Sequence, residues 1–364
     1  MEWTTLRFSL RAVDAAGTTL ITAGVAPEEM EDAMRVINNW RAAHSFPLNT
    51  FKMTLRNKAL SVDARAMVAQ RLKRLSSIEL KLRQYRGRFT LHEMQDIGGC
   101  RAIVSSTRQV DELVGLYRDS RLEHELIDED DYICNPKGTG YRGLHLIYRY
   151  HSDRSRRFNG RKIEMQLRSL AQHIWATAVE TVGTFTDQPL KSGGGSRDWR
   201  RFFALMGTEM ALRERTPPIP GTPTERTQLV SELRELAARL DVEARLEAYG
   251  GVESVLPRPK PKDRYFLLVL DSRLRRVSVR AYPQMELELA SRDLSETENA
   301  IKGNQNMDAV LVSVESVASL RRAYPNYFMD TRRFLEAVRR AIRSGGRPAA
   351  SAASGLPVIS APGV

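Results

Sequence analysis

The pattern that decides the fold of this chain is the stretch Lys162-Ile163-Glu164-Met165-Gln166-Leu167-Arg168, in which polar and apolar residues alternate. Successive side chains of a strand point to opposite faces, so the apolar residues lie on one face and the polar ones on the other. Ser169, a good helix N-cap, follows directly and begins a predicted helix that ends at about Val182. A half-buried strand that leads into a long helix is typical of a mixed α/β domain.

The segments around this unit predict the rest of such a domain, a central mixed sheet flanked by helices. Residues 1–24 show no clear period and are expected to form a loosely attached arm. The predicted helices begin at Pro27 and span 51–60, 63–85, 107–119 and 197–213, and the predicted strands span 101–104 and 144–150.

Two proline-rich breaks, at 216–223 and 256–261, divide the chain. A helix is expected between them, at 225–248. Beyond them a hairpin (265–271 and 276–282), a helix (284–302), a strand (308–313) and a helix (330–343) predict a small C-terminal α/β domain. The predicted organisation is an arm (1–26), a main domain (27–213), a linker with a helix (214–263), the C-terminal domain (264–343) and a disordered tail (344–364).

The composition favours a folded protein of the cytoplasm. Hydrophobic residues make up 42% of the 364 residues, which excludes global disorder. No apolar run approaches the ~20 residues of a membrane span, and the N-terminus lacks the pattern of a signal peptide. Two cysteines, Cys100 and Cys134, form no disulfide framework. We expect a monomer with no membrane contact, and no sequence feature fixes the oligomeric state.

The charge balance gives +12 with a pI near 9.9. This excess favours a polyanionic partner, either nucleotides or nucleic acid, and a merely basic surface is the alternative. The positions of the charges decide between them. Arg71, Ser77 and Lys81, with Arg74 nearby, are expected on one side of the predicted helix 63–85, where their donors suit phosphate oxygens.

Two further segments carry groups for nucleotide chemistry. Asp96 precedes a glycine pair and a strand, where its carboxylate can hold Mg²⁺, and Arg101 can stack on a base. An ordinary turn capped by Asp is the alternative. In the loop before residue 145, Tyr141 is a candidate stacking platform, surrounded by the donors Lys137, Arg142 and His145.

The polar face of 162–168 carries Lys162, Glu164, Gln166 and Arg168 and faces either water or a site. His173 and Trp175, on the following helix, are as consistent with packing as with ligand binding.

In this order the motifs resemble those of the RelA/SpoT nucleotidyltransferase family. The matching patterns are R-x-K-x-x-x-S-I-x-x-K (71–81), D-I-x-G-x-R (96–101), D-Y-x-x-x-P-K-x-x-G-Y-R-x-x-H (131–145), E-x-Q-x-R (164–168) and W-A (175–176). The resemblance covers about residues 30–210 and implies the fold of that family, with transfer of the β,γ-pyrophosphate of ATP to a ribose 3′-hydroxyl.

The resemblance also implies roles for single residues. Arg71 and Arg101 would enclose the adenine of ATP. Asp96 and Glu164 would bind Mg²⁺, and Glu164 would also accept the proton of the attacking hydroxyl. The triphosphate would be held by Lys73, Ser77 and Lys81, and the acceptor by Tyr141, Lys137, Arg142, His145, Gln166 and Arg168.

Two departures from the family pattern bear on the acceptor and on a second activity. Family synthetases carry Glu-His four and five residues after the tryptophan, where this chain has Val179 and Glu180, which leaves recognition of GDP or GTP open. No histidine is followed by Asp, so the His-Asp motif of the family's hydrolases is missing. The resemblance is therefore to a small alarmone synthetase.

The Y-x-x-Y pattern of Tyr324 and Tyr327, together with the length of the chain, resembles CapRel-type fused toxin–antitoxin proteins. That resemblance implies a toxin acting on the 3′ end of tRNA, restrained by the C-terminal domain until a phage protein binds. The two tyrosines would then block the ATP site, although packing tyrosines give the same pattern. A GDP/GTP pyrophosphokinase and a non-catalytic nucleotide sensor or RNA-binding protein stay open as alternatives.

Overall fold

The computed structural model describes residues 3–186, 188, 190, 193–249, 253–255, 263–304, 306–314, 317–325, 327–328 and 331–344. From residue 345 on, the tail expected to be disordered lies outside the described residues, as does the second proline-rich break. Among the described residues, no helix combines the length and the apolar character that a membrane crossing needs.

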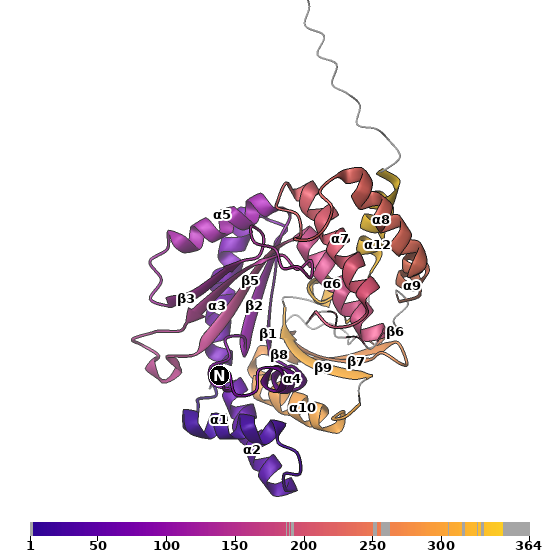
Figure 1. The fold of residues 1–364 in the computed structure, drawn as a ribbon. Helices are drawn as coiled ribbons and strands as arrows, with labels where there is room; N and C mark the ends of the chain where they lie inside the picture. Colours follow the sequence, from indigo (N-terminus) through magenta and orange to yellow (C-terminus); the bar gives the residue numbers. More distant parts are fainter. Residues whose placement is uncertain are drawn as a thin grey trace, which may run out of the picture.

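The described strands form a nine-stranded sheet in the order β3-β4-β5-β2-β1-β9-β7-β8-β6 (Figure 1). Its pairs β2–β5 and β6–β8 are parallel and the others antiparallel, so the sheet is mixed, as predicted. The strands are β1 (Met67–Leu72), β2 (Gly98–Val104), β3 (Glu125–Asp131), β4 (Leu144–Arg149), β5 (Lys162–Ser169), β6 (Glu253–Val255), β7 (Asp263–Asp271), β8 (Arg276–Pro283) and β9 (Met307–Ser313).

Helices pack on both faces of this sheet, and a group of helices packs together at one side of it. They are α1 (Leu10–Ile21), α2 (Pro27–Ala42), α3 (Ser45–Val62), α4 (Leu75–Gln84), α5 (Thr107–Arg118), α6 (Leu170–Phe185), α7 (Arg197–Glu214), α8 (Arg226–Arg239), α9 (Val242–Tyr249), α10 (Leu287–Ala300), α11 (Val317–Ala323) and α12 (Arg332–Ser344).

The alternation in β5 has the predicted effect. Ile163, Met165 and Leu167 are fully buried and pack with residues of α3 and α5 in one core cluster. The polar residues of β5 lie on the other face. At the end of the strand, Ser169 caps α6 through a bond with the backbone N–H of Gln172, as the sequence predicts. Strand and helix are therefore fixed relative to each other.

Two predictions about the first 85 residues are wrong. The expected loose arm contains α1, which Ser9 caps and which buries Val13 and Leu20 in a cluster with α2 and α4. The segment 63–85 is not one helix but a strand, β1, followed by α4. Arg71 therefore lies on the sheet, whereas Ser77 and Lys81 lie on α4. The three residues do not share a helix face, but all of them line the cavity described below.

Other elements were not predicted or were merged. No element was predicted for strand β3, which lies in an acidic stretch, for strand β6 or for helix α11. The single helix expected at 225–248 is two helices, α8 and α9. The predicted C-terminal hairpin forms as β7 and β8.

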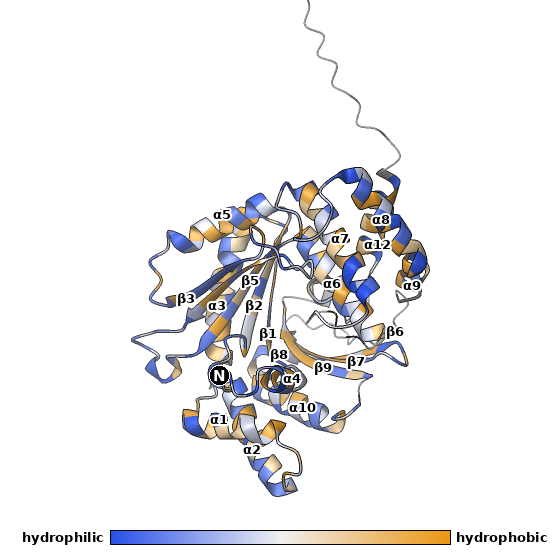
Figure 2. Ribbon diagram, in the orientation of Figure 1, coloured by the Kyte–Doolittle hydropathy of each residue, from blue (hydrophilic) through white to orange (hydrophobic). Residues whose placement is uncertain are grey.

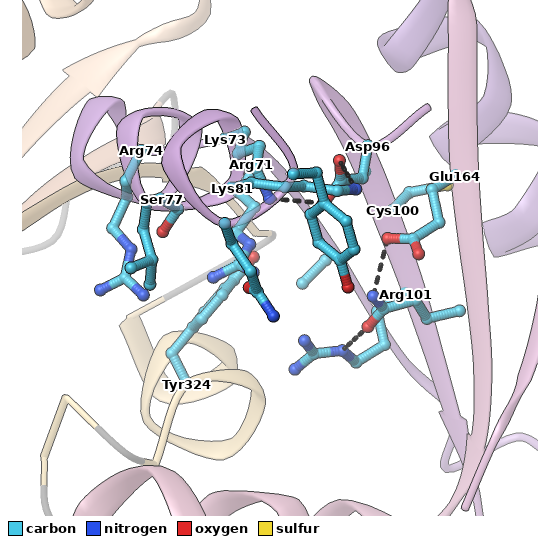
Figure 3. A pocket seen from close by; sticks show the side chains of 16 residues that line it. Arg71, Lys73, Arg74, Ser77, Lys81, Asp96, Cys100, Arg101, Glu164 and Tyr324 are labelled. Atoms are coloured by element: carbon cyan, nitrogen blue, oxygen red, sulfur yellow. Dashed lines mark hydrogen bonds and ion pairs between the residues drawn. The ribbon is translucent and has the colours of Figure 1, made fainter. Parts of the chain in front are cut away.

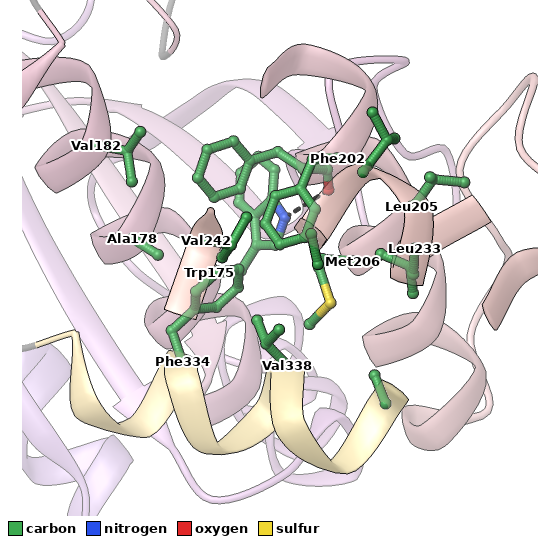
Figure 4. Packing of buried hydrophobic residues seen from close by; sticks show 14 of the residues in the cluster. Trp175, Ala178, Val182, Phe202, Leu205, Met206, Leu233, Val242, Phe334 and Val338 are labelled. Atoms are coloured by element: carbon green, nitrogen blue, oxygen red, sulfur yellow. Dashed lines mark hydrogen bonds between the residues drawn. The ribbon is translucent and has the colours of Figure 1, made fainter. Parts of the chain in front are cut away.

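Residues 263–344, called here the C-terminal unit, join the rest of the molecule in two ways. Strand β9 pairs with β1 through Gln70–Ser313 and Arg71–Val312, so the sheet continues into this unit. Helix α12 packs through Phe334 and Val338 against α6, α7 and α8 (Figure 4). Figure 2 shows strands β7 and β9 as largely hydrophobic, in keeping with their burial between α10 and α11.

Candidate active site

The register of β1, β2 and β5 aligns the polar residues across the sheet. Arg71 lies opposite Gly99, and Gly99 lies opposite Glu164; two residues further along, Arg101 lies opposite Gln166. Residues opposite each other in neighbouring strands project to the same face. The polar face of β5 therefore continues across β2 to β1, on the side that α3 and α5 leave free.

A cavity of about 420 Å³ opens over this face, between the sheet, α4 and α11 (Figure 3). All residues predicted to bind ATP or Mg²⁺ meet here, although they come from different segments of the chain. The cavity is lined by Ala69, Arg71, Lys73, Arg74, Ser77, Leu80, Lys81, Gln84, Tyr85, Asp96, Gly99, Cys100, Arg101, Glu164, Gln166 and Tyr324.

Asp96 is held by two lysines. Lys73 Nζ lies 2.5 Å from Asp96 Oδ2, and Lys81 Nζ lies 3.1 Å from Asp96 Oδ1. Burial raises the pKa of Asp96, but the attraction of the two ammonium groups outweighs it and the net pKa is lowered. The carboxylate is therefore ionised at neutral pH, with both oxygens directed at cations.

Glu164 lies near Asp96 in the cavity wall and is held by other partners (Figure 3). Its Oε1 lies 3.0 Å from His145 Nδ1, and its Oε2 accepts a 2.7 Å hydrogen bond from Gln166 Nε2. Burial opposes ionisation here too, but His145 and Gln166 lower the net pKa of Glu164. A carboxylate stabilised in this way is a good cation ligand and a weak proton acceptor.

A chain of polar contacts leads from Glu164 to Tyr141. The Tyr141 hydroxyl lies 2.5 Å from His145 Nε2 and accepts a 2.9 Å hydrogen bond from Arg168 Nη2. Burial alone would lower the pKa of His145, but Tyr141 and Glu164 raise it to about 9, so the imidazole is protonated at neutral pH. Tyr141, His145 and Arg168 thus adjoin the cavity through Glu164 and Gln166 without lining it.

The cations on this face outnumber their local anions. Burial and the neighbouring guanidinium groups of Arg168 and Arg71 lower the pKa of Arg101 to about 10. Burial also lowers the pKa of Lys73, with a further contribution from Lys81 and Arg71 that Asp96 only partly offsets. Crowded, partly desolvated cations gain from a polyanionic ligand, which relieves their repulsion. The cavity is suited to a triphosphate.

The donor set also fits Mg²⁺ in the form that nucleotide enzymes use. The described residues contain no group of three or more His, Cys, Asp or Glu that could hold a metal, but Asp96 and Glu164 line the same cavity and are both ionised. Mg²⁺ is commonly bound by one or two carboxylates together with water and substrate phosphates. For that, Lys73 and Lys81 have to turn from Asp96 toward the phosphates.

The two tyrosines of the C-terminal unit occupy different places. Tyr324 lines the cavity (Figure 3). Its hydroxyl donates a 3.1 Å hydrogen bond to the carbonyl oxygen of Gln70. Tyr327 does not line it; its hydroxyl donates to Asp308 (3.0 Å) and accepts from Arg74 (3.2 Å). Tyr324 is thus a wall of the cavity, and Tyr327 positions an arginine of that wall.

Four other residues singled out in the sequence do not line the cavity. Lys137 stands over the ring of Tyr132, with Nζ 3.9 Å from its centroid. Arg142 is buried and bound to Glu214 through a 2.7 Å ion pair, which fixes the loop to α7. Trp175 is a packing residue in the α6–α7 core, with Nε1 donating to the carbonyl oxygen of Phe203. His173 is also buried, with Nε2 3.2 Å from the carbonyl oxygen of Arg322.

Residues of the cavity wall that no sequence motif indicated include Ala69, Leu80, Gln84 and Tyr85. The signal was present for two of them. Leu80 and Gln84 follow Ser77 by three and seven residues, the spacing of one helix face. Both could have been assigned to the site once Ser77 was placed there.

Residues 70–184 match the model of a family described as the region found in RelA and SpoT proteins. The chain is 33% identical over 114 residues to the GTP pyrophosphokinase YwaC of Bacillus subtilis (strain 168), and 34% identical over 116 residues to the GTP pyrophosphokinase YjbM of the same strain. These alignments cover 29% and 30% of this chain and 52% of each relative, so the chain spans about half the length of the curated relatives it matches.

Similar solved structures include a GTP pyrophosphokinase family protein from Streptococcus pneumoniae, with 21% identity and a TM-score of 0.39 over 60% of this chain and 97% of that chain. Small alarmone synthetase 2 from Bacillus subtilis has 19% identity and a TM-score of 0.41 over 49% of this chain and 94% of that chain.

Proposed function

We propose that this chain, whose residues 70–184 match the region found in RelA and SpoT proteins, is an ATP-dependent pyrophosphokinase. It transfers the β,γ-pyrophosphate of ATP to a ribose 3′-hydroxyl. The observation that carries the proposal is the cavity in which two ionised carboxylates, Asp96 and Glu164, are set among the cations of β1, α4 and β2. Such a transfer needs in-line positioning and neutralised oxygens more than covalent help from the protein.

In this proposal ATP occupies the cavity with its triphosphate along α4. Lys73, Ser77 and Lys81 bind the phosphate oxygens, and Arg71 and Arg101 enclose the adenine. The geometry supports this division, because Lys81 and Ser77 project from one face of α4 while the two arginines project from the sheet.

Asp96 and Glu164 hold Mg²⁺ in the same proposal. The ion neutralises the charge that develops on the transferred group. The low pKa of Glu164 favours its part as a metal ligand over that of a proton acceptor, which was also assigned to it. The acceptor then lies beyond Glu164, beside Gln166, Arg168, His145 and Tyr141.

The acceptor that we favour is the 3′ end of tRNA. The net charge of +12 suits a long polyanion, and Val179 and Glu180 stand where a guanosine-specific synthetase carries Glu-His. The second candidate acceptor is GDP or GTP, with (p)ppGpp as the product. It is favoured by the two curated relatives, each of which is named a GTP pyrophosphokinase.

We further propose that the C-terminal unit restrains the enzyme, as the antitoxin part of a fused toxin–antitoxin protein. Tyr324 would restrict the adenine end of the cavity, which its place in the wall beside Arg71 and Arg101 supports. Tyr327 would hold Arg74 away from phosphate through its shared contacts with Asp308. A phage protein that binds this unit would withdraw both tyrosines and release activity against translation.

The test is a transfer assay with γ-labelled ATP and Mg²⁺, in which the full chain and its Tyr324→Ala variant are each given deacylated tRNA, GDP or GTP. Label on tRNA supports the first acceptor, and label on the guanosine nucleotide supports the second. Absence of label from every acceptor in both proteins would refute the enzyme. A growth test is independent of the acceptor: Tyr324→Ala in the full chain, which keeps Glu298, should make the chain toxic, and a harmless, folded variant would refute the restraint.

A further inference from the structure

The turn between β1 and α4 is held by a buried ion pair that reaches it from both sides. Arg41 of α2 and Glu298 of α10 form a two-bond pair, Nη1 to Oε2 at 2.7 Å and Nη2 to Oε1 at 3.1 Å. Their side chains are only 4% and 7% exposed. Because α10 belongs to the C-terminal unit, this pair joins two distant parts of the chain.

Both partners also bind the backbone of the turn. Arg41 Nε donates a 2.9 Å hydrogen bond to the carbonyl oxygen of Lys73, and Glu298 Oε1 accepts a 3.0 Å hydrogen bond from the backbone N–H of Leu75. The carbonyl group before Arg74 and the N–H group after it are therefore both fixed by one ion pair.

The contact with Leu75 supplies a cap that α4 lacks in its own sequence. Arg74 occupies the N-cap position of α4, and its side chain makes no capping hydrogen bond. The first N–H groups of a helix have no partner within the helix, and a carboxylate there also interacts favourably with the helix dipole. Glu298 provides this carboxylate from a position 223 residues away in the chain.

The position of α4 matters because residues of the turn and of α4 line the cavity. Lys73 is in the turn itself, and Ser77 and Lys81 lie on the first turns of α4, all three lining the cavity. A change of the order of 1 Å in the start of α4 would move the phosphate-binding groups relative to Asp96 and Glu164, and misplacement on that scale costs about a hundredfold in rate.

The geometry points to Glu298 as a positioning residue of the active site, which orients α4 for binding of the triphosphate of ATP. This inference rests on the proposed function. The C-terminal unit would then have two opposed effects on the site: Tyr324 restricts the cavity, while Glu298 keeps the phosphate-binding helix α4 in place. An activating event would have to move Tyr324 without breaking the contact of Glu298 with the turn.

The test separates positioning from mere support of the fold, and it uses the full chain with Tyr324→Ala as the parent. Glu298→Ala alone leaves Arg41 buried without its partner and is expected to lower the unfolding midpoint. The pair is therefore compared in two double variants, Arg41→Met/Glu298→Met and Arg41→Met/Glu298→Gln. Replacing both members of a buried ion pair by uncharged groups can restore stability, and only the glutamine variant keeps an oxygen for the N–H of Leu75.

Both double variants lose the bond from Arg41 to Lys73, and they differ in whether residue 298 carries an oxygen that can cap α4. We expect the two to have similar unfolding midpoints, above that of Glu298→Ala. The methionine variant should have a kcat/KM for ATP about a hundredfold below the parent, and the glutamine variant should stay within about tenfold. Equal kcat/KM values for the two, at equal midpoints, would overturn the inference.

Two further measurements do not need turnover. Hydrogen exchange at residues 75–77 should be faster in the methionine variant than in the glutamine variant, and the affinity for the ATP analogue AMPCPP should be lower. If the parent transfers no label to any acceptor, the proposed function fails, but these two comparisons still decide the role of Glu298. If the parent is active and neither comparison separates the variants, the role of Glu298 alone is refuted.

Discussion

The hydroxyl of Tyr324 donates a 3.1 Å hydrogen bond to the carbonyl oxygen of Gln70, so a side chain of the C-terminal unit is bound to strand β1 one residue before Arg71. The ring lies in the wall of the cavity, and the hydroxyl group is hydrogen-bonded to the backbone. Removal of the ring and removal of the hydroxyl alone are therefore different experiments.

Tyr324→Ala should raise the affinity for AMPCPP by about tenfold, or 1.4 kcal/mol, because it enlarges the cavity beside Arg71 and Arg101. Tyr324→Phe keeps the ring, loses only the bond to Gln70, and should stay near the wild-type affinity. Isothermal titration calorimetry gives both values. An alanine variant with unchanged affinity would show that the ring does not restrict the site.

In the Tyr324→Ala parent, which lacks the proposed restraint, Glu164→Gln should lower the rate of pyrophosphate transfer by about a thousandfold or more, since it removes a proposed ligand of Mg²⁺. The amide has the size of the carboxylate, so the far-UV circular dichroism spectrum should not change. Glu129→Gln in the same parent is the matched control: it removes a carboxylate of β3 that is bound to Arg118 of α5, and it should transfer at the rate of the parent. Substantial activity in Glu164→Gln would remove this residue from the catalytic set.

Gly140→Ala should destabilise the fold by about 2–4 kcal/mol. Gly140 has a φ of +98°, and an added Cβ would lie 2.7 Å from Trp175 Cζ2 and 2.9 Å from the carbonyl oxygen of Phe203. Gly138→Ala, two residues earlier, meets no atom within 4 Å and should change the free energy of unfolding by less than about 0.5 kcal/mol. Urea denaturation measures both, and equal effects would contradict this account of the loop.

The free energy of unfolding should fall as the pH drops below 6.5, in part because of His44. Burial lowers its pKa from 6.5 to about 3, so between these values the unfolded chain binds a proton that the folded chain does not. At pH 5 this amounts to about 2 kcal/mol.

His44→Asn removes the titrating group and keeps a donor for the carbonyl oxygen of Trp40, which lies 2.8 Å from His44 Nδ1. The loss of free energy of unfolding between pH 7 and pH 5 should then be about 2 kcal/mol smaller than in the wild type. The measurement is urea denaturation at both pH values, and the same loss in both proteins would contradict the prediction.

The sequence predicted the parts of the fold that depend on local pattern. The alternation in β5 and the cap at Ser169 are local signals, and both predictions are confirmed. Strand β1 was missed because its stability comes from pairing with β2 and β9, which are distant in sequence, whereas the residues around it have helical spacing. Strand β3 was missed because it is acidic, as exposed strands at the edge of a sheet often are.

In the candidate site, too, local patterns could be predicted and contacts between distant segments could not. Residue types and their spacing along the chain selected Asp96, Arg101 and Glu164, and the structure brings these three to one cavity. The sequence pattern could not predict the ion pair of Arg142 with Glu214 on α7, because that contact joins segments 72 residues apart. Nor could it find Glu298, because its contact with the turn is to a backbone N–H group, that of Leu75, which any residue except proline would carry.

Strand β1 has β2 on one side and β9, of the C-terminal unit, on the other. Deletion or displacement of that unit would leave the N–H and C=O groups near Gln70 and Arg71 without partners. An uncovered edge of this kind pairs readily with strands of other chains. A released or truncated protein would therefore tend to self-associate through the strand that carries Arg71, and its activity should fall as its concentration rises.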